Sequence, residues 1–437
     1  MNKSKSVLMI APYFVPRRRV GAVRPFRFAV NLPKYGYRPV VMTIGHKPAQ
    51  LTSAECELLS DIPVISIETG IDRTETVKRS DDVNQRDRGL SITDRVTQFI
   101  DRQTPIDTWT YLFLSRWRWI RSEALRVNPD LVWATGDPWS GLWLGKKLSK
   151  VLKKPFVADF RDPWTLANVG LRKRSQLSGW IDKKAEKSVI QSSDFLVFTS
   201  EATRSLYSDQ YHLSSDHSAT IYNTFDPIHR VEETDLNETP SKKNSDVIQI
   251  HFFGRFRRLS PVHPIVEILS RLKEQKPELA AKICIHSYGV PEAEQLQLID
   301  SAELNSQFIF EDVVTPEEAQ IALRPADLLL LSTNPSRDSI IPAKLWDYMV
   351  TGKPILSIVP NPEVEKILGS IESGIHFTPG NGLSPEEYLS NFVISESKGE
   401  NSSLPDSLVK KLESQHSAES RTKSLAGILD RLIAANR

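Results

Sequence analysis

Short apolar runs alternate with amphipathic segments along most of the chain. Runs that are apolar throughout predict strands buried on both faces of a parallel sheet, and the segments between them show the repeat of covering helices. Strands are expected at Val7–Ala11, Leu131–Thr135, Phe156–Phe160, Phe195–Thr199, Ala219–Tyr222, Ile248–Phe253, Lys282–Ser287, Phe308–Phe310, Asp327–Leu331 and Ile355–Ile358. The order predicts an α/β protein with two doubly wound parallel sheets.

A polar stretch separates the two groups of strands. Residues 227–246 are rich in Glu, Thr, Asn, Ser and Lys, a composition typical of a linker. We therefore expect a first domain at residues 1–226, a second domain at residues 247–400 and a helical segment at residues 401–437. The last helix is expected at Ser417–Ala434.

Two segments of the first half do not follow the strand and helix alternation. Residues 71–105 are strongly polar and predict a flexible loop followed by a short helix, which could cover a ligand site. Trp109–Ile120 is densely aromatic with interleaved arginines, so it could lie at a membrane interface. A core helix is the favoured interpretation, because the segment precedes a βα unit that must be covered on both faces.

The composition is that of an ordinary globular protein with enough apolar material for two cores. The 437 residues are 40% hydrophobic and 25% charged. The two cysteines, Cys56 and Cys284, have neither metal nor redox spacing, which favours a reduced cytoplasmic compartment. His251 lies in an alternating strand and is expected to be a hydrogen-bonded core or cleft residue. No metal and no cofactor are predicted.

The amino-terminal region is strongly basic. Residues 1–54 hold ten Lys or Arg and no Asp or Glu, which favours an anionic partner. Nucleic acid is not expected, since no nucleic-acid-binding signature accompanies these charges. The run Val7–Ala11 is too short for a signal peptide or a membrane span. We therefore expect a cytoplasmic protein, which could also bind peripherally to the inner face of the cell membrane.

The stretch Ile341–Leu356, IPAKLWDYMVTGKPIL, carries the clearest chemistry. Its apolar residues recur at helical spacing and predict a helix that faces a core and ends at Gly352. The preceding strand enters a polar loop at residues 333–339. A strand, a loop and then a helix favour phosphate binding, because backbone N–H groups at the helix start are free to bind an anion.

This arrangement resembles the C-terminal half of family-4 retaining glycosyltransferases. Their GT-B fold implies two Rossmann-like doubly wound domains facing a cleft, with a final helix that packs back toward the first domain. Asp347 matches the family carboxylate that accepts hydrogen bonds from the nucleotide ribose. The family's partner carboxylate falls on Ser339 here, and Asp338 could contact the donor sugar only if the loop shifts register.

The same resemblance extends to Ile248–Leu259, IQIHFFGRFRRL. There the strand ends at Gly254 and Arg255 follows, at the position where the family's arginine neutralises the donor diphosphate. The family lysine five residues later is Ser260 in this chain. Arg257, Arg258 or Lys344 could supply the missing cation; otherwise each is a solvated surface charge.

The first βα loop resembles the family loop that contacts donor and acceptor. Gly21 lies at the entry to the helix, and Arg17, Arg18 and Arg19 replace small residues that are common there. The three arginines either contact an anionic acceptor, such as a lipid-linked phosphate or an acidic glycan, or form an exposed basic loop.

Two further strands end in similar turns. Asp137 follows the strand at Leu131, and Arg161 and Asp162 follow the strand at Phe156. The carboxyl ends of parallel strands line the ligand crevice, so these three residues and Asp159, near the end of the second strand, are expected at the acceptor site. The string DFRDPW resembles a segment of some bacterial family-4 members. Asp162 is either a direct catalytic or acceptor-binding residue or a helix N-cap.

The resemblance implies transfer of a sugar from a nucleotide sugar, most simply a UDP- or GDP-sugar, to an acceptor hydroxyl with retention. It implies a role in polysaccharide or glycolipid biosynthesis, an anionic or lipid-linked glycan acceptor, and no need for a divalent metal. Two alternatives stay open: a non-catalytic scaffold, which would explain Ser260 and Ser339, and a sugar-nucleotide epimerase of the same fold.

Overall fold

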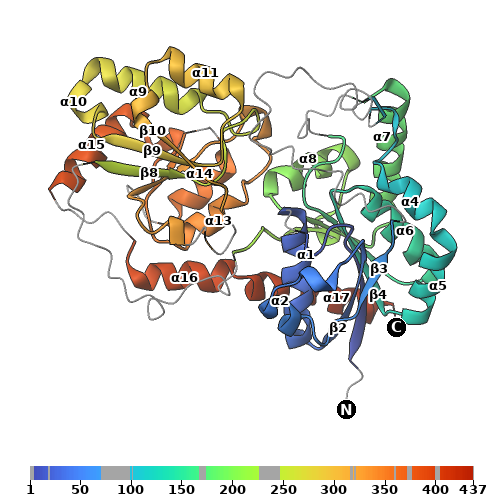
Figure 1. Ribbon diagram of the computed structural model, residues 1–437. Coiled ribbons are helices and arrows are strands. Elements are labelled where there is room, and N and C mark those ends of the chain that lie inside the picture. The colour runs from blue at the N-terminus through green and yellow to red at the C-terminus, as the bar shows by residue number, and fades with distance from the viewer. Residues whose placement is uncertain are drawn as a thin grey trace. The chain divides into compact units, whose positions relative to one another are not determined.

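The computed structural model describes residues 4–17, 20–69, 99–100, 102–166, 174–225, 247–314, 318, 321–358, 361–371, 376–398 and 404–436. The chain forms two compact units (Figure 1). The first unit contains Met1–Asn223 together with Ala418–Arg437, and the second contains Thr224–Ser417. The last helix therefore belongs to the first unit, and the helix before it belongs to the second.

The first unit is built on a seven-stranded sheet in the order β3-β2-β1-β4-β5-β6-β7. All neighbouring strands are parallel. The order reverses between β1 and β4, so the carboxyl ends of these strands form the switch point where a ligand crevice is expected. The strands are β1 (Lys5–Ile10), β2 (Tyr37–Ile44), β3 (Val64–Ile67), β4 (Leu131–Gly136), β5 (Phe156–Phe160), β6 (Phe195–Phe198) and β7 (Ser218–Thr220).

Helices cover this sheet. One group, α4 to α7, lies together along one side of the unit in Figure 1. The helices are α1 (Val20–Asn31), α2 (Ser53–Leu58), α4 (Trp109–Ser115), α5 (Trp117–Val127), α6 (Ser140–Leu152), α7 (Gln176–Ile190), α8 (Glu201–Tyr211) and α17 (Ala418–Ala435).

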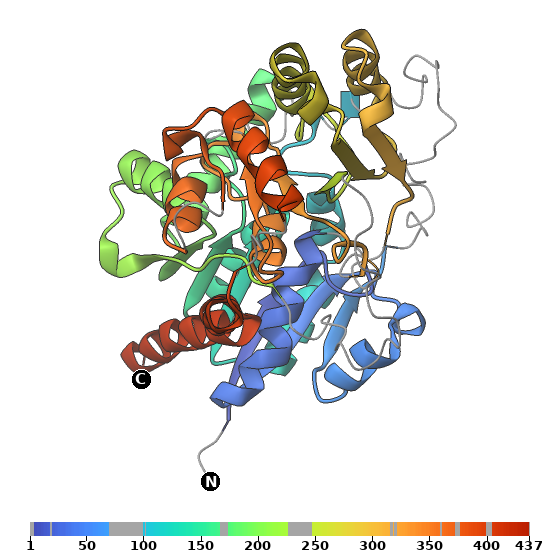
Figure 2. The same cartoon turned by 90° about the vertical axis from the view of Figure 1, so that its left-hand side faces the viewer.

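The carboxyl-terminal helix α17 packs against α1, as Figures 1 and 2 both show. Phe26 and Phe28 of α1 share a buried cluster with Leu425 and Leu429 of α17. Burying a side chain of this size contributes about 1.5 to 3 kcal/mol. The apolar face of α17 therefore fixes the end of the chain to the first unit.

A buried ion pair joins α1 to β5. Arg24 Nε lies 2.9 Å and 3.2 Å from the two carboxylate oxygens of Asp159, and both side chains are almost completely buried. Arg24 Nη1 also donates to the carbonyl of Tyr222 at 3.1 Å, near the end of the first unit. Because a buried charge is costly without its partner, this contact fixes α1 over the carboxyl end of β5.

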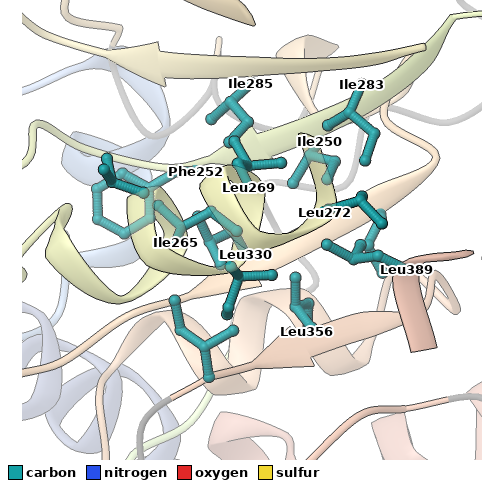
Figure 3. Close-up of a cluster of buried hydrophobic side chains, with 14 of the residues drawn as sticks. Ile250, Phe252, Ile265, Leu269, Leu272, Ile283, Ile285, Leu330, Leu356 and Leu389 are labelled. Atoms are coloured by element: carbon teal, nitrogen blue, oxygen red, sulfur yellow. The ribbon is translucent and has the colours of Figure 1, made fainter. Parts of the chain in front are cut away.

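The second unit has a five-stranded parallel sheet in the order β10-β9-β8-β11-β12. Figure 3 shows its core, where Ile250 and Phe252 of β8 pack with Leu269 and Leu272 of the covering helix α9. The strands are β8 (Ile248–Phe252), β9 (Ile283–Tyr288), β10 (Phe308–Glu311), β11 (Leu328–Leu331) and β12 (Ile355–Ser357). The helices are α9 (His263–Gln275), α10 (Pro277–Ala280), α11 (Ala293–Ser301), α13 (Lys344–Met349), α14 (Pro362–Gly369), α15 (Pro385–Ser397) and α16 (Asp406–His416).

Each of the ten predicted strands is present, within one or two residues of its expected ends. Strands β2 and β3 had not been predicted: β2 contains Pro39, which argues against a strand, and β3 is only four residues long. Among the described residues, no helix is long and apolar enough to cross a membrane. Most of the predicted polar loop at 71–105 lies outside the described residues.

The expected core helix at Trp109–Ile120 is wrong in part. The segment forms two helices, α4 and α5, separated at Arg116. Phe113 and Ile120 are buried, whereas Tyr111 and Trp119 are exposed. The segment covers the sheet with one face only, so two of its five aromatic side chains, Tyr111 and Trp119, remain on the surface.

We expect Asp159→Asn to destabilise the first unit by about 3 to 5 kcal/mol, because Arg24 would remain buried without a counter-charge. Urea unfolding followed by tryptophan fluorescence measures this unit, since eight of the nine tryptophans lie within it. Glu419→Gln is the control. Glu419 pairs with Lys34, directly after α1, but both side chains are exposed, so the loss of unfolding free energy should stay below about 1 kcal/mol. Equal losses in the two variants would contradict the assignment.

Candidate functional site

The turn after β8 is fixed from two sides. The carbonyl of Gly254 accepts a hydrogen bond from Ser287 Oγ at 3.1 Å, and the N–H of Phe253 donates to Tyr348 Oη at 2.9 Å. Gly254 has a φ of +108°, and a Cβ there would lie 3.1 Å from Lys344 Nζ. Glycine therefore permits both the turn and the close approach of the lysine.

Lys344 is the most unusual charge of the second unit. It begins α13, and its Nζ lies 3.9 Å from the centre of the Phe252 ring. Desolvation by burial, with a contribution from nearby Arg257, lowers the pKa of Lys344 to about 7. In the part of the chain that the structure describes, no carboxylate forms an ion pair with it. An ammonium group held in this way is suited to bind an anion.

The basic residues beside this lysine differ in their surroundings. Arg255 is half-buried, and its Cβ lies 3.2 Å from where a Cβ on Gly289 would be, so it stands between the loops that follow β8 and β9. Arg257 and Arg258 are exposed. Ser260 exchanges two backbone hydrogen bonds with Arg257, at 2.8 and 3.0 Å, and so closes a turn. Lys344 is therefore the cation that approaches Gly254.

The acidic and hydroxyl residues of the predicted donor site follow β11. Asp338 is exposed at the end of the short 3₁₀ helix Pro335–Arg337, and Ser339 is half-buried. Asp347 is half-buried in the first turn of α13, three residues after Lys344. The helix is shorter than expected, since α13 begins at Lys344.

Asn334 connects the loop after β11 to the loop after β8. Its side chain donates to the carbonyl of Arg258 at 3.0 Å, and its N–H donates to the carbonyl of Leu259 at 3.1 Å. Neither Asn334 nor Tyr348 was a candidate site residue from the sequence. Gly289 could have been found from the sequence, because it follows the predicted strand β9 in the same way that Gly254 follows β8.

In the first unit, Arg161 is the centre of a second cluster. Its Nη2 lies 3.0 Å from Asp162 and 4.0 Å from Asp137. Its Nη1 occupies the space beside Gly21, where a Cβ would come within 2.2 Å of it. The structure thus brings together Gly21, in the first turn of α1, with Asp137, Arg161 and Asp162, which follow β4 and β5. Asp162 bonds to the arginine, and the described residues directly after it do not form a helix for it to cap.

Two stacked tryptophans hold the loops that carry these residues. Trp139 follows Asp137, Trp164 follows Asp162, and their rings stack with centres 5.5 Å apart at an angle of 5°. The N–H of Trp164 also donates to Tyr207 Oη at 2.8 Å. The recurrence of Asp-Pro-Trp after two strands was visible in the sequence and could have indicated this pairing.

Glu186 of α7 holds the loop that carries Asp162 and Trp164. The fully buried carboxylate accepts hydrogen bonds from the Thr165 N–H at 3.0 Å and from Tyr211 Oη at 3.1 Å, and also from Tyr207. Burial raises the pKa of Glu186, which these bonds oppose. The Arg161–Asp162 turn is therefore supported by a polar network beneath it.

The basic loop after β1 is only partly described. Arg17 is half-buried, with its guanidinium 5.6 Å from the ring centre of Tyr13 and 5.5 Å from that of Trp109. Arg17 is therefore held against two aromatic rings and is only partly exposed. Arg18 and Arg19 lie outside the described residues.

Comparisons with known proteins agree with this architecture. Residues 74–228 match the sequence model of Glycosyltransferase Family 4. No curated protein matches the sequence of the chain. The structure of HepE from Anabaena in complex with UDP is similar, with a TM-score of 0.61, 14% identity and coverage of 98% of this chain and 100% of HepE. The chain has the GT-B fold of glycosyltransferases.

Two more GT-B structures extend the comparison. Sucrose-phosphate synthase from Thermosynechococcus elongatus has a TM-score of 0.65 at 12% identity, with coverage of 99% of this chain and 100% of the synthase. A glycosyltransferase from Rickettsia africae has a TM-score of 0.56 at 13% identity, with full coverage of both chains. At these identities the similarity shows the fold, and this confirms the predicted fold class.

His251, on β8 of the second unit, has a structural role. His251 is buried, and its Nδ1 lies 3.0 Å from Tyr288 Oη, which confirms the predicted hydrogen-bonded core residue. Burial lowers the pKa of His251 to about 3, so it stays neutral. Among the described residues, no group of three or more His, Cys, Asp or Glu could hold a metal ion.

We expect the affinity for a nucleoside diphosphate to fall as the pH rises above about 7, because the anion needs protonated Lys344. With a pKa near 7 in the free protein and a higher one in the complex, the loss should approach tenfold per pH unit between pH 7 and 9. Lys344→Arg stays charged and should give a flat profile over this range. Calorimetry with UDP at several pH values measures both proteins, and identical profiles would remove Lys344 from the site.

Proposed function

We propose that this protein is a glycosyltransferase that moves a sugar from a nucleotide-sugar donor to an acceptor hydroxyl with retention. The observation that carries the proposal is Lys344, a half-buried residue whose desolvated ammonium lies beside Gly254 and near Arg257 at the carboxyl end of β8. Burying a cation beside other cations costs folding free energy, which an anionic ligand would offset. The GT-B fold and the match to Glycosyltransferase Family 4 support transfer of a sugar.

The donor site that we propose has three parts. Lys344 and Arg255 bind the diphosphate and stabilise the charge that develops on it as the sugar leaves. Arg258 adds a more distant positive charge. Asp347 accepts hydrogen bonds from the ribose hydroxyls, and Asp338 or Ser339 contacts the sugar. HepE was solved with UDP, and a UDP-sugar is the first donor to test.

Retention would follow from attack on the same face of the sugar as the departing diphosphate. The acceptor hydroxyl gives its proton to a donor phosphate oxygen, the new glycosidic bond forms and the bond to the diphosphate breaks. This path needs fixed cations more than it needs a protein nucleophile. Arg255 and Lys344 supply them, and the reaction as we propose it uses no metal and no cofactor.

For the acceptor we propose the cluster around Arg161 in the first unit. Asp162 and Asp137 offer carboxylate oxygens, and Arg161 offers a guanidinium held between them. A glycan that carries an acidic group or a lipid-linked phosphate suits Arg161, together with Arg17 to Arg19. Such an acceptor is typical of polysaccharide or glycolipid synthesis, which we propose as the biological role.

The function is tested by incubating the protein with UDP-, GDP- and ADP-sugars and following release of the nucleoside diphosphate and the anomeric configuration of the product. One nucleotide series should raise the melting temperature.

Arg255→Ala should lower transfer by about 2 to 4 kcal/mol at the transition state while the protein stays folded. Lys273→Ala, on the exposed face of α9, is the control. Absence of nucleotide binding would favour the scaffold, and conversion of the donor sugar without transfer would favour the epimerase.

Asp347→Asn should weaken binding of the free nucleoside diphosphate, because an amide offers one acceptor oxygen where the carboxylate offers two. The loss should be about 1 to 2 kcal/mol and should not depend on the sugar. Asp338→Asn is the matched control, since it should affect only the intact nucleotide sugar. Calorimetry with both ligands separates the two, and unchanged affinity in Asp347→Asn would leave it an ordinary helix residue.

A further inference from the structure

The first unit carries a surface that is both apolar and basic, which we call the α4–α7 face. It consists of the outward side chains of α4, α5 and α7 and of residues 99–100 and 102–103. Large apolar side chains lie open on it: Leu177 is 67% exposed, Tyr111 59% and Trp180 55%. Phe99, Ile100, Leu114, Trp119 and Leu125 are exposed as well. Half of the exposed large hydrophobic residues of the described chain lie on this one face.

The segments that carry these side chains are joined to one another within the first unit. Ser178 Oγ at the start of α7 donates to the carbonyl of Gln103 at 2.6 Å, and Ser175 N–H donates to the carbonyl of Arg102 at 3.0 Å. Asp182 of α7 accepts a hydrogen bond from the N–H of Ile106, just before α4. Helix α6 contacts α4, α5 and α7, and Figure 1 shows the four helices together.

The charge of the face is strongly positive. Its outward cations include Lys183, Lys184 and Lys187 on α7, and others are Arg102, Arg116, Arg118 and Arg121. On α7 the three lysines share the exposed side of the helix with Leu177 and Trp180, and Lys184 Nζ lies 3.8 Å from the Trp180 ring centre.

The described acids of these segments face inward or are paired. Asp107 is buried and accepts from the N–H of Ser140 at 2.8 Å, where α6 begins. Asp182 is buried against Arg174 at 2.6 Å, and Glu186 is buried in the network beneath Thr165. Glu123 pairs with Arg126 at 2.6 Å. The described part of the face therefore presents cations and apolar side chains without a free carboxylate.

We propose that the α4–α7 face binds the surface of an anionic phospholipid bilayer. Exposed Trp and Tyr rings and aliphatic side chains would enter the headgroup region while lysines and arginines contact lipid phosphates. Aliphatic side chains such as Leu177, Ile100 and Leu114 would gain nothing from single-stranded nucleic acid, which needs stacking rings. A protein partner would have to be strongly acidic over the whole face. This inference rests on the first unit alone and not on sugar transfer.

The test is sedimentation of the full chain with vesicles of phosphatidylcholine containing increasing fractions of phosphatidylglycerol. The wild-type protein should bind the anionic vesicles, with affinity falling as salt rises, because exposed charges act over about 8 Å at physiological ionic strength. Lys183→Gln, Lys184→Gln and Lys187→Gln together should weaken binding by at least about tenfold. Leu177→Ser with Trp180→Ser should weaken it similarly at every salt concentration.

Matched controls come from the second unit. Lys273→Gln, Lys276→Gln and Lys410→Gln remove the same charge from exposed positions, and Val313→Ser removes an exposed apolar side chain. Both controls should bind vesicles as the wild type does. Melting temperatures of all variants establish that they fold, and amide exchange in the wild type should slow at residues 99–127 and 176–187 when vesicles are added.

Three outcomes would overturn the proposal. The first is no binding of wild-type protein to anionic vesicles, or equal loss in the α7 and control variants. The second is tighter binding to a single-stranded oligonucleotide, lost in the same α7 variants, which would make the face a nucleic-acid site. The third is self-association in the absence of lipid, lost in the Leu177 and Trp180 variant, which would make it an interface between copies. None of these outcomes tests sugar transfer to a soluble acceptor, so failure of this proposal is distinguishable from failure of the proposed function.

Discussion

The first unit depends on the buried ion pair between Arg24 and Asp159. Two charges can be buried together only when their geometry is good, because each loses several kcal/mol of hydration. The pair therefore fixes α1 over the carboxyl end of β5. Arg161 follows Asp159 by two residues and lies against Gly21, three residues before Arg24. The geometry of the candidate acceptor cluster is thus a consequence of the ion pair beneath it.

The second unit uses charge in the opposite way. Lys344 is half-buried and holds its positive charge over an aromatic ring and near Arg257, and desolvation lowers its pKa to about 7. Stability alone would favour an apolar residue here. A residue that breaks a local rule of folding in this way is typical of a functional site. In the first unit Asp159 pairs with the buried Arg24, whereas among the described residues no carboxylate forms an ion pair with Lys344.

Elements with one dominant signal could be predicted from the sequence. The apolar run of β11 and the alternating run of β8 are strands wherever they pack, and Gly254 could be recognised because it follows such a strand. Strand β2 could not, since Pro39 is compatible with it only because of the pairing it makes in the folded sheet. Which side chains of Trp109–Ile120 are buried could not be predicted either, because the number of rings that the sheet covers depends on how α4, α5 and α6 pack.

The sequence by itself determined the two parallel sheets, their order along the chain and the set of polar residues at the carboxyl ends of the strands. It did so because apolar periodicity and strand-terminal turns are local properties. Only the tertiary structure decided that Lys344, and not Arg257 or Arg258, approaches Gly254, and that Arg161 fills the space beside Gly21. Those outcomes depend on distances between segments far apart in the chain, which are set by packing and by the cost of burying charge.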